Sequence, residues 1–320
     1  MMNYKNFLKY FYSTLPLFVK RKIEVKRKEK RKAVIKERMS SVFVSETDLD
    51  EIFSKFTIDT DVFLHSSLTN IGTIEGGVEY VVNKILEKIN IEKHTLLIPA
   101  LPIQGRFIDY LRRSPVFDVR TAPVKMGAVS EYLAVMQGAK RSVHPTHSVV
   151  AIGANAKKYT STHHLDSTPF GVNSPYYKLL ENNAEIMYFG VTPYVTTYVH
   201  VIEDMFSDLF PVEVYADEEF CVPCLNEYGE PLTVKTKVHD PQSSINRNVL
   251  ILNQYFIDYG AILFTHPIGD SNIIIADVRK LTIAYLNAMK DELTIYGKFK
   301  ISPKIKNKIS ELLTYIENSK

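Results

Sequence analysis

Cysteine is scarce in this sequence, which limits the covalent and metal chemistry that it can support. Only Cys221 and Cys224 are present among 320 residues. Two cysteines cannot build the disulfide framework of a small secreted domain, so we expect a reducing, cytoplasmic compartment. Cys221-Val222-Pro223-Cys224 has the spacing of half a zinc site. No second pair accompanies it, and we therefore predict no metal site.

The sequence also lacks the segments that usually carry a protein into or across a membrane. It has no run of about eighteen apolar residues, so we expect no transmembrane helix. The amino terminus alternates aromatic and basic residues without an apolar core and a small-residue cleavage site, so we expect no signal peptide. Internal repeats are absent as well. The hydrophobic content of 45% is enough for one large core.

Positive charge is concentrated at the amino terminus. Residues 1–40 hold thirteen Lys and Arg and three Glu, a net charge of +10. The other 280 residues hold 26 basic and 33 acidic side chains, a net charge of −7, which gives +3 for the whole chain. An acidic body argues against nucleic acid as a partner. We predict a basic arm over residues 1–40 and a single domain over residues 45–320.

The arm has two interpretations. One is a solvated helical segment. The other is an aromatic anchor, closed by Leu15-Pro16-Leu17-Phe18, followed by a polybasic stretch that rests on an anionic membrane surface. The second would make the protein peripheral to the inner face of the membrane, and the sequence alone leaves both open.

Short apolar runs that end at Gly or Pro predict buried strands separated by helices, which indicates an α/β layer with parallel strands. We expect strands at 61–65, 95–98, 149–152, 186–189, 261–265 and 272–277. Helices are expected at 47–56, 78–88, 126–136, 154–163, 174–182, 242–254, 278–291 and 303–319. Alternation over 212–222 and 231–238, around a Tyr228-Gly229 turn, predicts an antiparallel hairpin. Residues 100–125 form a long loop, a type of segment that is usually functional.

His200 is the strongest candidate for chemistry. The strand at 186–189 ends at Gly190, a turn with Pro193 follows, and a helix is expected to start near Thr196. His200 then lies in the first turns of that helix, with Glu203 on the same face. Ligands and chemistry gather outside the carboxyl ends of strands in α/β folds. The alternative is a structural histidine paired with an acid.

An ordered series of short segments carries a family resemblance. The segments are His65-Ser66-Ser67-Leu68, Gly76-Gly77, Phe117-Asp118, Thr121-Ala122-Pro123, Met126-Gly127, Arg141-Ser142-Val143-His144-Pro145, Ser148, Gly171-Val172-Asn173-Ser174-Pro175, Gly190-Val191, and Thr197 with His200 and Glu203. Together they resemble the aminoglycoside 3-N-acetyltransferase family. The resemblance covers about residues 47–210 and is poor in the last 110 residues. It implies a three-layer α/β/α sandwich around a mixed sheet, a single acetyltransferase domain and acetyl-CoA as cofactor.

The resembling segments also suggest where coenzyme A would bind. Glycines before a helix let the backbone approach phosphates, and a cation with hydroxyl and imidazole donors suits a phosphate clamp. The residues at the end of the first core strand are placed to face the thioester. Each of these segments also has a purely structural interpretation. The glycines can serve only a tight turn, the arginine can be buried to fix a loop, and the residues at the strand end can cap the strand. The candidates are His65, Ser66, Ser67, Gly76, Gly77, Met126, Gly127, Arg141, Ser142 and His144.

For catalysis we predict His200 as general base, because an imidazole can remove a proton as the amine attacks the thioester. No acyl-enzyme is then needed. The resemblance implies Thr197 in the site and a downstream carboxylate that orients the histidine. His239-Asp240 stands at the corresponding place, so Asp240 is predicted as that partner, and Glu203 is the alternative. Asp118, Phe170 and Asn173 are predicted to line the acceptor pocket.

The acceptor amine is the least constrained prediction. Our first hypothesis is N-acetylation of a nucleotide-linked amino-deoxy sugar for surface polysaccharide such as O-antigen or capsule, because of the basic arm and the Tyr and Phe residues after position 210. The first alternative is aminoglycoside 3-N-acetylation that confers antibiotic resistance, which suits the acidic body. The second is a silent binding module. In each case the partner is a small molecule, and a homodimer stays open.

Overall fold

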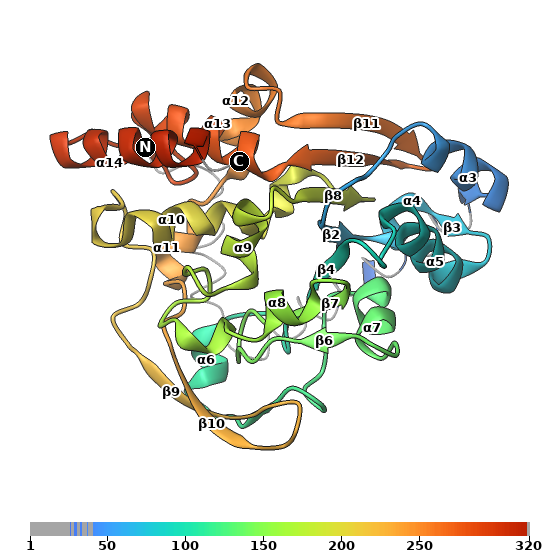
Figure 1. Ribbon diagram of the computed structural model, residues 1–320, viewed down its shortest axis with the longest axis horizontal. Helices are drawn as coiled ribbons and strands as arrows, with labels where there is room; N and C mark the ends of the chain where they lie inside the picture. The colour runs from blue at the N-terminus through green and yellow to red at the C-terminus, as the bar shows by residue number, and fades with distance from the viewer. Residues whose placement is uncertain (1–25, 27–28, 31–32, 34–36, 38–40, 319–320) are drawn as a thin grey trace.

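The computed structural model describes residues 41–318 together with residues 26, 29, 30, 33 and 37 (Figure 1). Most of the predicted basic arm therefore lies outside the described residues. Among the residues described, none of the helices combines the length and the apolar character that a membrane crossing requires.

A seven-stranded mixed sheet forms the centre of the fold, in the order β11-β12-β8-β2-β4-β7-β6. The central strand β2 runs parallel to β8 and β4, and every other neighbouring pair is antiparallel. The parallel layer expected from the short apolar runs is thus confined to three strands. The bounds are β2 Val62–Ser66, β4 Thr95–Pro99, β6 Lys140–Arg141, β7 Val149–Gly153, β8 Glu185–Phe189, β11 Ile262–Ile268 and β12 Ser271–Asp277.

Both faces of this sheet are buried, which explains the unbroken apolar runs in its strands. In β2, Phe63 points into one hydrophobic cluster, whereas Val62 and Leu64 point into the other. The first cluster contains side chains of α8 Ala156–Thr160, α9 Pro175–Glu181, α10 His200–Phe206, α12 Asn253–Asp258, α13 Val278–Lys290 and α14 Pro303–Asn318. The second contains those of α3 Glu46–Ser54, α5 Gly77–Ile89 and α7 Ala128–Ala134.

Helix ends follow local capping chemistry. Helix α3 begins after Ser45, whose hydroxyl accepts from the Asp48 amide while the Asp48 carboxylate accepts from the Ser45 amide. The helix expected from residue 47 therefore starts one residue earlier, at Glu46. Helix α9 begins with Ser174 as cap and Pro175 as first residue, as predicted.

The predicted helix over 242–254 is broken in the structure. It consists of α11 Pro241–Ile245, a 3-10 turn Val249–Leu252 and α12. Asp240 caps α11, and Asn248 caps the turn through its own side chain. Each cap starts a new helical segment, and the connection between the first two segments carries Arg247.

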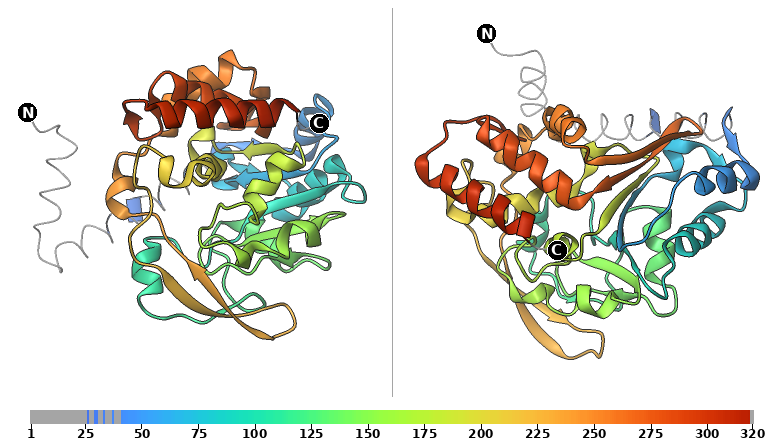
Figure 2. Two further views of the ribbon diagram at one scale, coloured as in Figure 1. Left: turned by 60° about the vertical axis from the view of Figure 1, so that its left-hand side comes forward. Right: turned by 45° about the horizontal axis from the view of Figure 1, so that its top comes forward.

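The predicted hairpin is present as β9 Phe220–Leu225 and β10 Pro231–Thr236, although the first strand starts later than expected. It projects from the body at the lower edge of Figure 1 and is also visible in both views of Figure 2. Strand β9 also pairs with β5 Phe117–Asp118, inside the long loop that contains α6 Phe107–Leu111 as well. Smaller elements are β1 Phe43–Val44, β3 Thr73–Ile74, α4 Leu68–Ile71, β13 Leu293–Thr294 and β14 Gly297–Lys298, with 3-10 turns His163–Leu165, Pro193–Val195, Thr197–Val199 and Ser207–Leu209.

An isolated bridge between Tyr215 and His239 marks where the chain returns from the hairpin to the body. The Ala216 amide donates to the Val238 carbonyl, and the Asp240 amide donates to the Val214 carbonyl. These contacts hold the segment at 238–240 extended, which places His239 against α10.

Candidate active site

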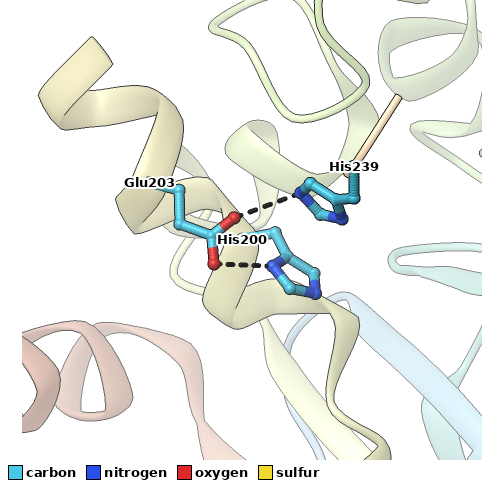
Figure 3. Close-up of side chains that lie close together, drawn as sticks. All are labelled: His200, Glu203 and His239. Carbon is cyan, nitrogen blue, oxygen red and sulfur yellow. Dashed lines mark hydrogen bonds and ion pairs between the residues drawn. The ribbon is translucent and has the colours of Figure 1, made fainter. Parts of the chain in front are cut away.

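A single carboxylate, that of Glu203, connects two histidines (Figure 3). His200 is the first residue of α10, and Glu203 follows one turn later, so the two share a helix face. The distance from His200 Nδ1 to Glu203 Oε1 is 2.9 Å, and that from His239 Nε2 to Glu203 Oε2 is 3.2 Å. The Glu203 side chain is 0% exposed and that of His200 is 6% exposed. The group is therefore largely shielded from water.

Further side chains fix this arrangement. The Tyr296 hydroxyl donates to Glu203 Oε1 at 2.9 Å. The Phe170 ring lies 5.1 Å from the His200 ring and 5.6 Å from the His239 ring, measured between centroids. The Tyr215 ring stacks on His239 at 4.9 Å. Both imidazoles are held by rings on one side and by the carboxylate on the other.

Arg247 determines the tautomer of His200. Its Nη1 lies 2.9 Å from His200 Nε2. A guanidinium has only donors, so Nε2 must carry the lone pair. His200 Nδ1 then carries the proton and donates it to Glu203. The atom able to accept a proton is thus Nε2, on the side of the ring away from Glu203.

The electrostatics favour an ionised Glu203 and a neutral His200. Burial lowers the pKa of His200 to about 4, against the opposing effect of the Glu203 charge. Burial alone would raise the pKa of Glu203, but His200 and His239 outweigh it and hold that pKa below its usual range. At neutral pH the imidazole is deprotonated and able to act as a base.

His200 lines a cavity of about 710 Å³. We call this cavity the His200 cleft. Two arginines line it, Arg106 and Arg247, and none of its described lining residues is acidic. The lining comprises Leu101, Gly105, Arg106, Phe107, His147, Tyr194, Val195, Thr196, Thr197, His200, His239, Pro241, Gln242, Ser244, Ile245, Arg247 and Val249.

Three buried polar atoms on β2, on β8 and at the edge of the cleft lack hydrogen-bond partners. They are His65 Nε2, Tyr188 Oη and Thr196 Oγ1. The His65 and Tyr188 rings stack at 5.7 Å, and Thr196 lines the cleft. Buried polar atoms normally have a partner, either protein, water or ligand. Of the three, Thr196 Oγ1 is the atom that a ligand in the His200 cleft could reach.

The donor atoms of His200, Glu203 and His239 all lie within 4.8 Å of one another, a spacing that a metal ion could use. In the structure these atoms face one another instead, and Tyr296 adds a donor to Glu203. Hydrogen bonds account for Oε1 of Glu203, whereas Oε2 of Glu203 and Nε2 of His239 lie 3.2 Å apart without a well-aligned hydrogen bond. The absence of a metal site remains a prediction.

Several predicted cofactor residues have structural roles. Arg141 is half-buried and donates to the backbone carbonyls of Ala122 and Ala100 and to the Ser148 hydroxyl. Each nitrogen of its guanidinium thus already donates within the protein, and Arg141 does not line the His200 cleft; its role in a phosphate clamp stays a prediction. The other two residues of that clamp, Ser142 and His144, are fully buried, with the Ser142 hydroxyl 2.8 Å from His163 Nδ1 and the His144 ring stacked on His163.

Gly76 is the N-cap of α5 and Gly77 its first residue, and Gly76 lies beside an acidic side chain. A side chain at Gly76 would place its Cβ 2.7 Å from Glu46 Oε1. A carboxylate beside this helix terminus disfavours a phosphate there. Met126 packs against the second hydrophobic cluster, and Gly127 precedes α7. None of these residues lines the His200 cleft.

Among the remaining predicted residues, only Thr197 and His200 line the cleft. His65 is buried in β2, which ends at Ser66, and Ser67 follows it; the Ser67 amide donates to the Phe189 carbonyl. Phe170 is buried beneath the two imidazoles and does not line the cleft.

The two predicted acceptor residues with polar side chains are engaged elsewhere. Asp118 pairs with Arg120 at 2.7 Å, and that contact lowers the pKa of Asp118 to about 2. Asn173 donates to Asp166 through both its amide and its side chain. Neither reaches the described lining of the His200 cleft.

The prediction of Asp240 as the partner of His200 is wrong. Asp240 Oδ2 accepts from the amides of Gln242 and Ser243, which caps α11. The carboxylate on His200 is Glu203, our alternative. His239, the residue before Asp240, contacts Glu203 instead. Successive side chains of an extended segment point to opposite sides, so His239 and Asp240 cannot both face the site.

Three functional side chains were missed. The sequence pointed to the pair His239-Asp240, but we predicted Asp240, the acid of the pair, as the partner of His200. Arg247 and Tyr296 lie 47 and 93 residues from their partners in the site. No local pattern in the sequence indicates either contact.

Comparison with solved structures defines the class of the fold. A chain described as "AAC-IIIb binary with CoASH" has a TM-score of 0.65 at 20% identity, covering 82% of this chain and 100% of that one. The aminoglycoside acetyltransferase AAC(3)-Xa has a TM-score of 0.62 at 20% identity, covering 79% and 94%. The mixed sheet with helices is therefore the fold of aminoglycoside acetyltransferases.

The family is established by sequence. The family model for aminoglycoside 3-N-acetyltransferase matches residues 63–290, and the chain belongs to this family of acyltransferases. Aminoglycoside N(3)-acetyltransferase III of Pseudomonas aeruginosa is 26% identical over 153 residues, 44% of this chain and 56% of that protein. The aminoglycoside N(3')-acetyltransferase-like protein YokD of Bacillus subtilis is 27% identical over 158 residues, 44% and 57%. The alignments thus span just over half the length of these relatives.

We predict that Glu203→Gln slows turnover whereas Asp240→Asn does not. Loss of the Glu203 charge removes the group that orients and polarises His200, so the fall in kcat should be roughly 10²–10⁴-fold. Asparagine is itself a good helix cap, so Asp240→Asn should keep both fold and activity. Circular dichroism melts check that both variants fold. Equal kcat values for the two variants would contradict the assignment of Glu203.

We also predict that acid destabilises the fold through its buried histidines. Burial lowers the pKa of His65 and His163 to about 3 and that of His144 well below its usual value. The unfolded chain takes up these protons below about pH 6.5 and the folded chain does not, so stability falls as pH falls. At pH 5 the loss is about 2 kcal/mol each for His65 and His163, and His144 acts in the same direction. Urea unfolding at pH 7 and pH 5 measures this, and an unchanged midpoint would contradict it.

Proposed function

We propose that this protein is an acetyl-CoA-dependent N-acetyltransferase that acts on the amino group of an amino sugar. One observation carries the proposal. His200 is neutral, its tautomer is held by a buried ionised carboxylate, and its Nε2 lies on the side away from Glu203, where it accepts from Arg247 in the lining of the cleft. That is the state required of a general base that removes a proton from an amine.

Acetyl-CoA would supply an acetyl group activated as a thioester. The acceptor nitrogen forms a bond to the acetyl carbon, the bond from that carbon to sulfur breaks, and the nitrogen releases a proton. His200 Nε2 takes that proton, and the imidazolium that results is stabilised by Glu203, which already lies 2.9 Å from Nδ1. His239 and Tyr296 hold the carboxylate in place during this change of charge. No cysteine lines the cleft, so the chain offers no thiol there for a covalent intermediate.

The cleft suits the arm of the cofactor. Apolar side chains of Leu101, Phe107 and Val195 line its walls, and the unsatisfied Thr196 hydroxyl lies beside them. A largely uncharged chain with amide groups matches this mixture of surfaces. We propose that these residues, with Thr197, hold the arm that ends in the thioester.

Two acceptor classes are supported by different observations. The relatives and solved neighbours are named for aminoglycosides, and a neighbour is described as bound to sisomicin, so an aminoglycoside acceptor is the better supported of our two hypotheses. The nucleotide-linked amino sugar is favoured by Arg106 and Arg247 in the cleft. We do not propose a silent binding module, because the base and its carboxylate are both in place.

The domain organisation and the basic arm are the subject of further proposals. We propose that residues 45–320 form one domain and that the sheet with its two helical clusters forms a three-layer α/β/α sandwich. We propose further that residues 1–40 contact an anionic membrane surface from the cytoplasmic side. A homodimer is compatible with these proposals.

His200→Ala should lower turnover by roughly 10²–10⁴-fold, because the amine then lacks a positioned base. Thiol release from acetyl-CoA in the presence of aminoglycosides and nucleotide amino sugars measures the rate. Calorimetric titration with coenzyme A is the control, and its affinity should stay within a few fold. Unchanged turnover would remove His200 from the mechanism.

Deletion of residues 1–40 should leave kinetics unchanged and weaken binding to anionic vesicles, because about 1 kcal/mol of attraction is lost for each basic side chain near the surface. Co-sedimentation with phosphatidylserine vesicles and with neutral vesicles compares the two forms. Equal sedimentation of full-length and truncated protein would contradict membrane binding and support the interpretation of the arm as a solvated segment.

A further inference from the structure

Arg247 covers the atom of His200 that the proposed reaction needs. Its Nη1 lies 2.9 Å from Nε2, and Nδ1 is already bonded to Glu203. A neutral imidazole has one lone pair, and here that lone pair accepts from the guanidinium. A proton from an acceptor amine therefore reaches Nε2 only after Arg247 has moved.

The contact that holds Arg247 is weak for an arginine. Among the ion pairs of the described residues, none includes Arg247, and Glu203 lies behind the His200 ring with its oxygens facing His200, His239 and Tyr296. The imidazole that accepts from Arg247 is neutral, whereas an anion carries the opposite charge and can accept two parallel hydrogen bonds from the guanidinium. An anion in the cleft would therefore compete well with the imidazole for this guanidinium.

The position of Arg247 favours such an exchange. It follows α11 and precedes the 3-10 turn Val249–Leu252, so it stands on a short connection between two capped segments. The second arginine of the cleft, Arg106, has a carboxylate nearby, Asp109 at 3.5 Å. Arg247 is thus the more available of the two cations.

We propose that Arg247 is a specificity-determining residue, which binds a phosphate or carboxylate group of the acceptor and thereby uncovers Nε2 of His200. This inference rests on the proposed function in its nucleotide-linked form, because it assumes that His200 deprotonates the amine of an acceptor with an anionic group, which an aminoglycoside lacks. In coenzyme A the pantetheine arm separates the phosphates from the sulfur. An arginine in contact with the base is therefore at the acceptor end of the cleft, away from the phosphates of the cofactor.

The proposal predicts how the charge state of His200 responds to Arg247. The charged and titratable groups that face His200 are Glu203 on its own helix, His239 after the hairpin, His147 before β7, and Arg247. The positive charge of Arg247 lowers the pKa of His200. Removal of that guanidinium by Arg247→Gln, or its displacement by an anion, therefore raises the pKa of His200. The substitution leaves Glu203, His239 and His147 in place.

The first test needs no knowledge of the acceptor. Full-length protein labelled with ¹⁵N-histidine is titrated with inorganic phosphate, with acetate and with coenzyme A, and the His200 ring nitrogens are followed by NMR. Arg247→Gln is compared with Arg113→Gln, which removes an exposed arginine outside the cleft lining. We expect phosphate or acetate to shift the His200 resonances of the wild type and of Arg113→Gln. In Arg247→Gln the apparent affinity for that anion should be at least about tenfold weaker.

Two outcomes of this titration would overturn the proposal. One is the same anion response in Arg247→Gln as in the wild type. The other is the full response with coenzyme A alone, because the anion would then belong to the cofactor. A response to phosphate but not to acetate, or the reverse, identifies which anion the acceptor carries.

The second test is kinetic and separates this proposal from the proposed function. Thiol release from acetyl-CoA is measured with glucosamine, glucosamine 1-phosphate and kanamycin. We expect the phosphorylated amine to have a kcat/KM at least about tenfold higher than that of glucosamine, and Arg247→Gln to abolish the difference. A preference for kanamycin that Arg247→Gln leaves unchanged would refute the role of Arg247 while N-acetyltransfer stands. Thiol release with none of the amines would count against the proposed function, and the NMR titration would still decide the role of Arg247.

Discussion

The structure depends on one buried carboxylate. Glu203 has no exposed side-chain surface, and an ion in such a place costs several kcal/mol unless its oxygens find donors. Here His200 from the same helix and Tyr296 from the turn between β13 and β14 donate to Oε1, and His239 from the segment after the hairpin lies 3.2 Å from Oε2 as an ion-pair contact. Three parts of the chain must therefore be in place before the charge is tolerated, and the same contacts hold His200 in one tautomer.

The fold supplies these three parts by different means. The loop after β8 leads into α10 at the carboxyl end of a parallel strand, where α/β folds place ligands. The hairpin returns through the Tyr215–His239 bridge, so His239 arrives from a separate small sheet. Phe170 packs between these groups and excludes water from the imidazoles. On one side of His200, hydrogen bonds from His200 and Tyr296 hold Glu203 in place. On the side of the cleft, His200 contacts Arg247, which lies on a short connection between two helical segments.

The sequence allowed the prediction of features that depend on local spacing. Strands β2, β4, β7 and β8 follow from short apolar runs, and the pairing of His200 with Glu203 follows from their separation of one helical turn. Features that depend on distant contacts were not predictable. Tyr296 approaches Glu203 across 93 residues, and the choice between His239 and Asp240 depended on which side of an extended segment faces α10. The contacts of Arg141 with the backbone carbonyl oxygens of Ala100 and Ala122 are likewise not visible in the sequence.

The central claim is that Glu203 is ionised and that His200 is a neutral base protonated at Nδ1. Neutron diffraction from crystals of the full chain at neutral pD locates these hydrogen atoms directly. The account predicts deuterium on His200 Nδ1, none on His200 Nε2 and none on either oxygen of Glu203. Deuterium on Glu203, or on Nε2 of His200, would contradict it.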